Sequence, residues 1–253
     1  MVAYGGGVNS TAMLIGCVER GEPIDAILFA DTGGEKPATY HYLWTFSRWL
    51  EERGHVLRIV NNNQRSIDDS LEAECLRRAN LPSKTYGFSK CSEKWKIRPQ
   101  ERYATEWDTA RATWRAHGKV TKLIGIDAGE AHRAKITETE KYLYRYPLIE
   151  WDWSRDECET AIMRAGLPIP PKSACFYCPS SKKPEVLKLR REEPHLFDRA
   201  VALEQHALES GQLTKIVGLG RHWSWKTLVE VDEAQRDLFP EPTESSCVCY
   251  DGE

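Results

Sequence analysis

The sequence predicts an α/β protein built on a doubly wound, mostly parallel sheet, with a C-terminal helical segment that carries cysteines. Two observations lead to this fold class. Short apolar runs, typical of buried strands, alternate with longer stretches of helical periodicity through residues 1–150. Glycine-rich turns follow several of these runs. This placement is typical of doubly wound sheets, because their ligands bind beyond the carboxyl ends of the strands.

The strands and helices alternate in the order that such a sheet requires. We expect strands at residues 1–4, 26–30, 55–60 and 120–126, and helices at residues 9–20, 37–53 and 97–117. Asn9 or Ser10 would cap the first helix. Residues 61–90 show no clear periodicity, so we expect an irregular or partly helical insertion there.

The pattern of the sequence changes after residue 150, where helical stretches and a proline-rich loop replace the alternation of strands and helices. Ser154 and Glu157 form a capping box that predicts a helix up to residue 165, followed by a proline-rich loop. Further helices are expected at residues 184–191 and 194–210, and an irregular tail from residue 239. We therefore expect a nucleotide-binding α/β domain at 1–150 and a helical, cysteine-bearing domain at 151–253.

Composition excludes some classes of protein. No apolar run approaches the ~20 residues that cross a bilayer, and the first residues lack the pattern of a signal peptide. We expect a cytoplasmic protein with no membrane partner. The net charge of −3 over 253 residues argues against a surface that nucleic acid wraps as a whole, although it allows a local basic patch.

The stretch YGGGVNST, residues 4–11, predicts an anion site. Glycine lets backbone N–H groups approach a ligand that a Cβ would hold away, and a helix N-terminus directs its unpaired donors to the same point. A phosphate group fits there. The other interpretation is a glycine-rich turn without a ligand, because the pattern matches neither a P-loop nor a GxGxxG fingerprint.

The cysteines are expected to be thiols, metal ligands or redox groups rather than structural disulfides. Cys175 and Cys178 form CFYCP, whose spacing lets two sulfurs face one point, as in zinc, iron–sulfur and dithiol sites. Cys91 is their expected companion, because the basic residues of KCSEKWKIRP would stabilise a thiolate there.

Three ordered segments carry a resemblance to a known family. GGGVNS, DTGGEKPATY and GIDAGEAHR resemble the SGGxDS, DTGxxxPET and GIRADExxR segments of the PP-loop adenine nucleotide α-hydrolase superfamily, in its phosphoadenosine phosphosulfate reductase-like branch. Gly5, Asn9 and Gly129 depart from these patterns, and Asn9 removes one carboxylate. The resemblance implies a Rossmann-like, HUP-type fold that binds ATP with Mg²⁺ and cleaves it between the α and β phosphates.

The resemblance also implies roles for individual residues. Ser10 and Arg133 would be catalytic. The nucleotide would be bound by Gly5, Gly6, Gly7, Asn9, Ser10, Thr11, Asp31, Thr32, Gly125, Glu130 and Arg133.

The cysteines have two interpretations within this family. Cys91, Cys175 and Cys178 resemble the three thiolates that hold the 4Fe-4S cluster of ATP-dependent thiolation enzymes. The alternative is a structural zinc ion with Cys247 or Cys249 as its fourth ligand. Cys249 also resembles the C-terminal nucleophile of sulfonucleotide reductases, so it is a third catalytic candidate.

The sequence thus favours an ATP-dependent sulfur transferase that adenylates its substrate. Its rivals are a sulfonucleotide reductase and a non-catalytic nucleotide-binding module with structural zinc. The aromatic and basic stretch at 221–226 and the basic helix at 182–191 suit a tRNA or DNA substrate beside the adenine nucleotide. A homodimer is also expected, and the sulfur donor is not indicated.

Overall fold

The structure is a computed structural model, and it describes residues 1–62, 67–82, 84–85, 88–213 and 215–238. The chain divides into two compact units. Unit 1 comprises Met1–Arg78 and Pro82–Cys178, and unit 2 comprises Ala79–Leu81 and the chain from Pro179. The units therefore divide after Cys178, whereas the sequence predicts a boundary at residue 150.

Unit 1 contains a five-stranded, all-parallel sheet in the order β3-β2-β1-β6-β7. Its strands are β1 (Val2–Tyr4), β2 (Ile27–Ala30), β3 (Leu57–Val60), β6 (Val120–Ile124) and β7 (Tyr142–Arg145). In the central strand, Val2 pairs with Ile27 of β2 on one side and with Leu123 of β6 on the other. The predicted α/β fold class is confirmed.

Strand order reverses between β1 and β6. The chain proceeds from β1 to β2 and β3 in one direction, and then returns to place β6 and β7 on the opposite side of β1. At such a reversal the loops after the two central strands part and leave a crevice in which ligands bind. These are the loops that carry GGGVNS and GIDAGEAHR.

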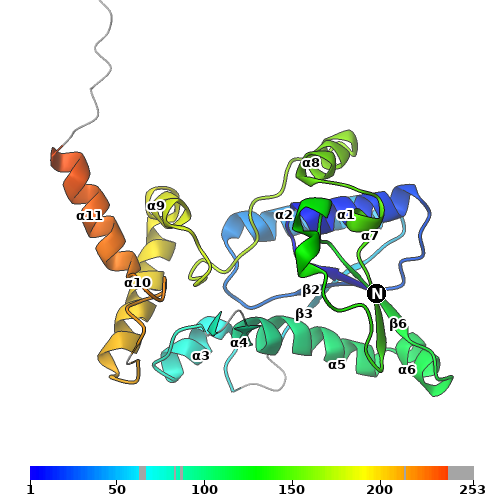
Figure 1. Cartoon of the computed structure of the whole chain (residues 1–253), viewed down its shortest axis with the longest axis horizontal. Coiled ribbons are helices and arrows are strands. Elements are labelled where there is room, and N and C mark those ends of the chain that lie inside the picture. Colours follow the sequence, from blue (N-terminus) through cyan, green and yellow to red (C-terminus); the bar gives the residue numbers. More distant parts are fainter. Residues whose placement is uncertain (63–66, 83, 86–87, 214, 239–253) are drawn as a thin grey trace, which may run out of the picture. The chain divides into compact units, whose positions relative to one another are not determined.

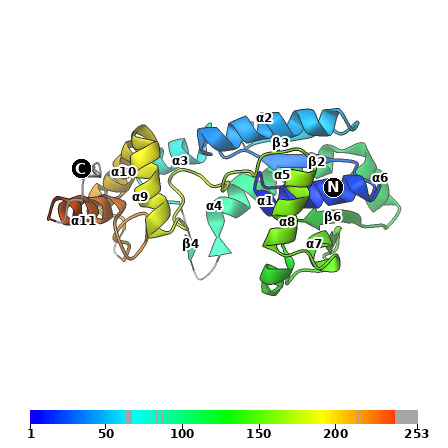
Figure 2. The same ribbon diagram turned by 90° about the horizontal axis from the view of Figure 1, so that it is seen from above.

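Helices cover both faces of the sheet. The helices α1 (Val8–Glu19) and α2 (Pro37–Glu51) lie on one face, while α5 (Arg98–Glu106) and α6 (Asp108–Arg115) lie on the other (Figure 1). Figure 2 shows α8 (Arg155–Arg164) crossing α1, against which it packs. Among the described helices, none has both the length and the apolar character needed to span a membrane.

Each face has its own hydrophobic core. Residues of α1, α2 and α8 pack with β1 and β2, and Leu14, Ile15 and Phe46 are completely buried in this cluster. On the other face, Ala104 and Ala110 pack against Leu28 with no exposed surface. Burial on both faces explains why β2, whose four residues are all buried, reads as a continuous apolar run.

Several elements differ from those expected. The helix predicted at 97–117 is two helices, because Trp107 adopts an extended conformation with ψ 120°. The insertion contains α3 (Leu71–Arg77) and a short strand pair, β4 (Lys84–Thr85) and β5 (Phe88–Ser89). Other elements that were not predicted are β7, α7 (Pro147–Glu150), the 3₁₀ helix Ala128–Arg133 and the helix Trp225–Leu238.

The ends of two helices show which local signals were reliable. The capping box of α8 is confirmed, since the Ser154 N–H donates to Glu157 Oε2 (2.9 Å) while Ser154 Oγ accepts from the Asp156 N–H (3.2 Å). The predicted cap of α1 is wrong: its N-cap is Gly7, which offers no side chain.

Unit 2 is helical, with α9 (Lys183–Glu192), α10 (Pro194–Glu209) and α11 (Trp225–Leu238). The buried Glu204 carboxylate accepts from the N–H groups of Leu219 (2.6 Å) and Trp225 (3.0 Å) and from the Ser224 hydroxyl (2.6 Å). Trp225 is only 1% exposed, so it cannot stack on a base as the sequence suggested for this stretch.

Gly125 supplies a test of how closely β6 approaches α1. A Cβ at this residue would lie 2.7 Å from Ser10 Cα and 2.8 Å from its backbone nitrogen, so Gly125→Ala must displace the start of α1. We expect urea unfolding to show a loss of about 1–3 kcal/mol. Gly129→Ala is the control, because its Cβ would meet Asp127 Oδ1 at an ordinary 3.4 Å. Equal stabilities of the two variants would contradict the packing.

Two core thiols predict a pH dependence of stability. Burial raises the pKa of Cys17 and of Cys158 to about 12, from an ordinary value of 9.0. Above pH 9 the unfolded chain releases thiol protons that the folded protein retains, so stability is fully present below pH 9 and falls as pH rises further. Urea unfolding at pH 7.5 and pH 10 measures this loss. It should shrink in Cys17→Ala and in Cys158→Ala, and an unchanged loss in both would refute the assignment.

Candidate functional site

The glycine loop leads directly into the first turn of α1. Gly6 has a positive φ of +73°, which only glycine adopts without strain. The Ser10 hydroxyl accepts from the Gly5 N–H (3.2 Å) and donates to the Gly7 carbonyl (3.1 Å), which closes the loop on itself. No side chain caps Gly7, so the first N–H groups of α1 are left for solvent or a ligand.

The loop after β2 connects the predicted nucleotide site with the cysteines. Asp31 Oδ1 accepts from the Gly33 N–H and from the Tyr40 hydroxyl, both at 2.8 Å. Thr32 is buried, and its Oγ1 lies 3.1 Å from Cys175 Sγ. Asp31 therefore shapes this turn, while Thr32 contacts a predicted metal ligand.

The loop after β6 is tied to the glycine loop. Asp127 is buried, and its Oδ2 accepts from Asn9 Nδ2 (2.8 Å). Its Oδ1 accepts from the Glu130 N–H (2.9 Å) and so begins the short 3₁₀ helix Ala128–Arg133. A carboxylate thus lies against the loop even though residue 9 is an asparagine.

Two further predicted residues differ in exposure. Thr11 is fully buried and its hydroxyl pairs with that of Tyr4 (3.1 Å), which places it in the core. Arg133 is exposed and forms an ion pair with Glu130.

The cysteine loop runs alongside the loop after β2. The Phe176 N–H donates to the Gly34 carbonyl (2.8 Å), and Cys175 forms an isolated β-bridge with Glu35. Ser173, two residues before Cys175, would contact a Cβ at Gly6 at 3.5 Å through its Oγ. The glycine loop and the cysteine loop are therefore adjacent within unit 1.

A buried ion pair joins these loops. The Glu35 side chain is fully buried, and it accepts from Lys96 Nζ (3.0 Å) and from Ser173 Oγ (3.2 Å). Burial by itself would lower the pKa of Lys96, but the Glu35 carboxylate, and Cys175 and Cys178 when they are ionised, outweigh it and raise that pKa. Lys96 is thus a cation that lies near these sulfurs.

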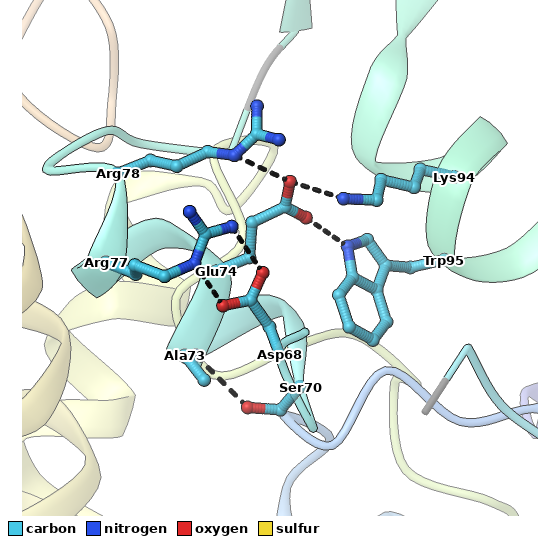
Figure 3. Close-up of polar contacts among 8 residues, drawn as sticks. All are labelled: Asp68, Ser70, Ala73, Glu74, Arg77, Arg78, Lys94 and Trp95. Atoms are coloured by element: carbon cyan, nitrogen blue, oxygen red, sulfur yellow. Dashed lines mark hydrogen bonds and ion pairs between the residues drawn. The ribbon is translucent and has the colours of Figure 1, made fainter. Parts of the chain in front are cut away.

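Cys91 is brought to the same region by the insertion. It lies in the helical turn Lys90–Ser92, which continues through a π-helical turn (Glu93–Ile97) into α5. Glu74 of α3 anchors this segment by accepting from Lys94 Nζ (2.5 Å) and from Trp95 Nε1 (2.6 Å), as Figure 3 shows. Burial, followed by the charge of Cys178, raises the pKa of Cys91, so these two thiols lie near each other.

A fourth thiol lies beside this group. Burial, then the charges of Glu74, Cys91 and Cys175, raise the pKa of Cys75 to about 12. Sequence analysis did not single out Cys75, because this residue belongs to no short motif.

The three predicted ligands do not form a metal centre as they lie. Burial raises the pKa of the Cys175 thiol. In the part of the chain that the structure describes, no three His, Cys, Asp or Glu side chains are grouped closely enough to hold a metal ion. We therefore route no step through iron, zinc or Mg²⁺. Cys247 and Cys249 lie outside the described residues.

Sequence reasoning missed the residues that connect the loops. Glu35 lies within DTGGEKPATY and Ser173 lies just before CFYCP, but their contact spans most of unit 1 in sequence and needs the folded sheet. Asp127 and Arg155 were missed for the same reason, since both contact Asn9.

Comparisons with known proteins identify no family and no function for this site. No family model matches the chain. It is 25% identical over 247 residues to an uncharacterized protein of Methanocaldococcus jannaschii, MJ0066, an alignment that covers 89% of this chain. The chain spans 45% of the length of that archaeal relative.

The Glu35–Lys96 pair predicts a specific stability effect. Lys96→Met leaves the buried Glu35 carboxylate without its cation, and we expect a loss on the order of 2 kcal/mol in urea unfolding. Arg164→Met is the matched control, because the Arg164–Glu19 pair (2.6 Å) is exposed and such pairs contribute less than about 1 kcal/mol. Similar losses in both variants would show that Glu35 does not depend on Lys96.

Proposed function

We propose that this protein is an ATP-dependent sulfur transferase. ATP binds at the loops that follow β1, β2 and β6, and an oxygen of the acceptor attacks the α-phosphorus and releases pyrophosphate. Sulfur at the hydrosulfide oxidation level, held beside the cysteines, then attacks the adenylated atom of the acceptor, and AMP leaves with the oxygen, so that no oxidant or reductant is needed. A nucleic acid, tRNA or DNA, is the proposed acceptor.

One observation carries this proposal. Ser173 lies against Gly6 and donates to Glu35, whose backbone bridges to Cys175. A phosphate on the glycine loop would therefore lie near the cysteines. A nucleotide-binding module without sulfur chemistry would not need buried thiols and a lysine at this place.

The first step needs stabilisation of charge rather than a protein nucleophile. The glycine loop and the N-terminus of α1 offer backbone donors to the phosphates, and these donors are fixed before the ligand arrives. Ser10 holds the loop closed by its two hydrogen bonds. Arg133 is exposed close to the same sheet edge, where it can exchange Glu130 for a phosphate.

The second step takes place on the side of the cysteines. Cys178 is partly exposed and Cys175 is buried, so Cys178 is the thiol of this pair that a sulfur donor reaches. Lys96 lies near both thiols and would stabilise an anionic sulfur there.

Nucleotide binding is tested by a pair of glycine substitutions. Gly6→Ala and Gly54→Ala place an alanine at similar positive φ values, +73° and +79°, so both impose backbone strain. Only Gly6 belongs to the loop. We expect calorimetry to show that Gly6→Ala weakens ATP binding at least tenfold while Gly54→Ala leaves it unchanged. Equal affinities, or no ATP binding by the wild type, would overturn the nucleotide site.

The sulfur chemistry is tested by metal and sulfide analysis of anaerobically purified protein. If the cysteines rearrange to hold a 4Fe-4S cluster, it would appear as about four irons and four sulfides per chain, and Cys175→Ser would then abolish both. Stoichiometric zinc without sulfide would support the structural alternative and contradict sulfur transfer by these cysteines. Release of pyrophosphate from ATP in the presence of RNA or DNA then identifies the acceptor.

A further inference from the structure

Asn9 lies between two side chains of opposite charge. Its Nδ2 donates to Asp127 Oδ2 (2.8 Å), which turns its Oδ1 toward Arg155, whose Nη1 lies 3.5 Å away. Asn9 is in the first turn of α1, directly after the glycine loop. The neighbourhood of the loop therefore contains a buried carboxylate and a guanidinium.

Arg155 reaches this position from another helix. It is the first residue of α8, and the capping box at Ser154 and Glu157 fixes that helix start. Its side chain is 56% exposed and also donates from Nε to Glu159 Oε1 (2.8 Å). Such an i,i+4 pair on a surface contributes only about 0.3–0.5 kcal/mol, so Arg155 can leave it at little cost.

A phosphate bound at the glycine loop would need a cation nearby, because Asp127 places a negative charge there. Asp127 is 6% exposed, so solvent screens its charge less than that of a surface carboxylate. Phosphate groups bound at the N-terminus of α1 would be repelled by it. Of the two charged side chains that contact Asn9 in the described structure, Arg155 is the one that attracts phosphate.

We infer that Arg155 is a phosphate-contact residue of the nucleotide site, which it enters from α8 beside the glycine loop. This inference rests on the proposed function. Arg155 exchanges its contacts with Glu159 and Asn9 for a phosphate oxygen, and guanidinium groups bind phosphates through two parallel N–H donors. It thereby distinguishes a phosphorylated nucleotide from a nucleoside.

The test compares ATP and adenosine binding by calorimetry in Arg155→Gln, Arg155→Lys and Arg164→Gln. Arg164 is the matched control, because it lies on the same helix, is 54% exposed and pairs with Glu19. Because Arg155→Gln loses a charged hydrogen bond, we expect its affinity for ATP to fall by about tenfold or more. Adenosine affinity should not change, Arg155→Lys should lose less, and Arg164→Gln should match the wild type.

The outcomes separate this inference from the function on which it rests. Wild type that binds ATP while Arg155→Gln binds it equally well overturns the role of Arg155 alone. Equal losses for ATP and adenosine would show that Arg155 acts on the fold rather than on phosphate, which also overturns it. Wild type that binds no ATP refutes the nucleotide site itself. Thermal unfolding of each variant verifies that substitution of these half-exposed side chains leaves the protein folded.

Discussion

The rest of the site depends on the interactions of one buried group, the carboxylate of Glu35. It pairs with Lys96 and Ser173, and its backbone bridges to Cys175, so three segments far apart in sequence meet at one residue. A carboxylate removed from water needs a cation and further donors to remain there. Lys96 and Ser173 supply both, and in doing so they hold the cysteine loop against the loop after β2.

The parallel sheet makes this meeting geometrically possible. Because β1 is central and the strand order reverses beside it, the loops after β1 and β6 lie next to each other at the carboxyl edge of the sheet, where ligands of such folds bind. The Asn9–Asp127 hydrogen bond joins these two loops, and the absence of a Cβ at Gly125 allows the chain after β6 to approach α1 closely. The insertion then brings Cys91 to the cysteine loop through Glu74 and its bonds to Lys94 and Trp95.

The sequence was sufficient for features that depend on local pattern. Short, mostly apolar runs identified β1, β2, β3 and β6, and Ser154 with Glu157 identified the start of α8. It was insufficient where tertiary contacts decide. Trp225 belongs to an aromatic and basic stretch of the kind that stacks on bases. In the structure it is buried, and its backbone N–H donates to the Glu204 carboxylate. Arg155 has no motif, and its position at the glycine loop follows only from the packing of α8 on α1.

The central claim is that the glycine loop and the cysteines form one site, and the most direct test is the alkylation rate of Cys178 with and without ATP. Mass spectrometry of the folded protein follows this partly exposed thiol separately from the buried ones. The account predicts that saturating ATP changes the rate at Cys178 severalfold, because bound phosphates alter access and charge beside Ser173 and Lys96. An unchanged rate, with ATP shown to be bound, would place nucleotide and cysteines in separate sites and contradict the account.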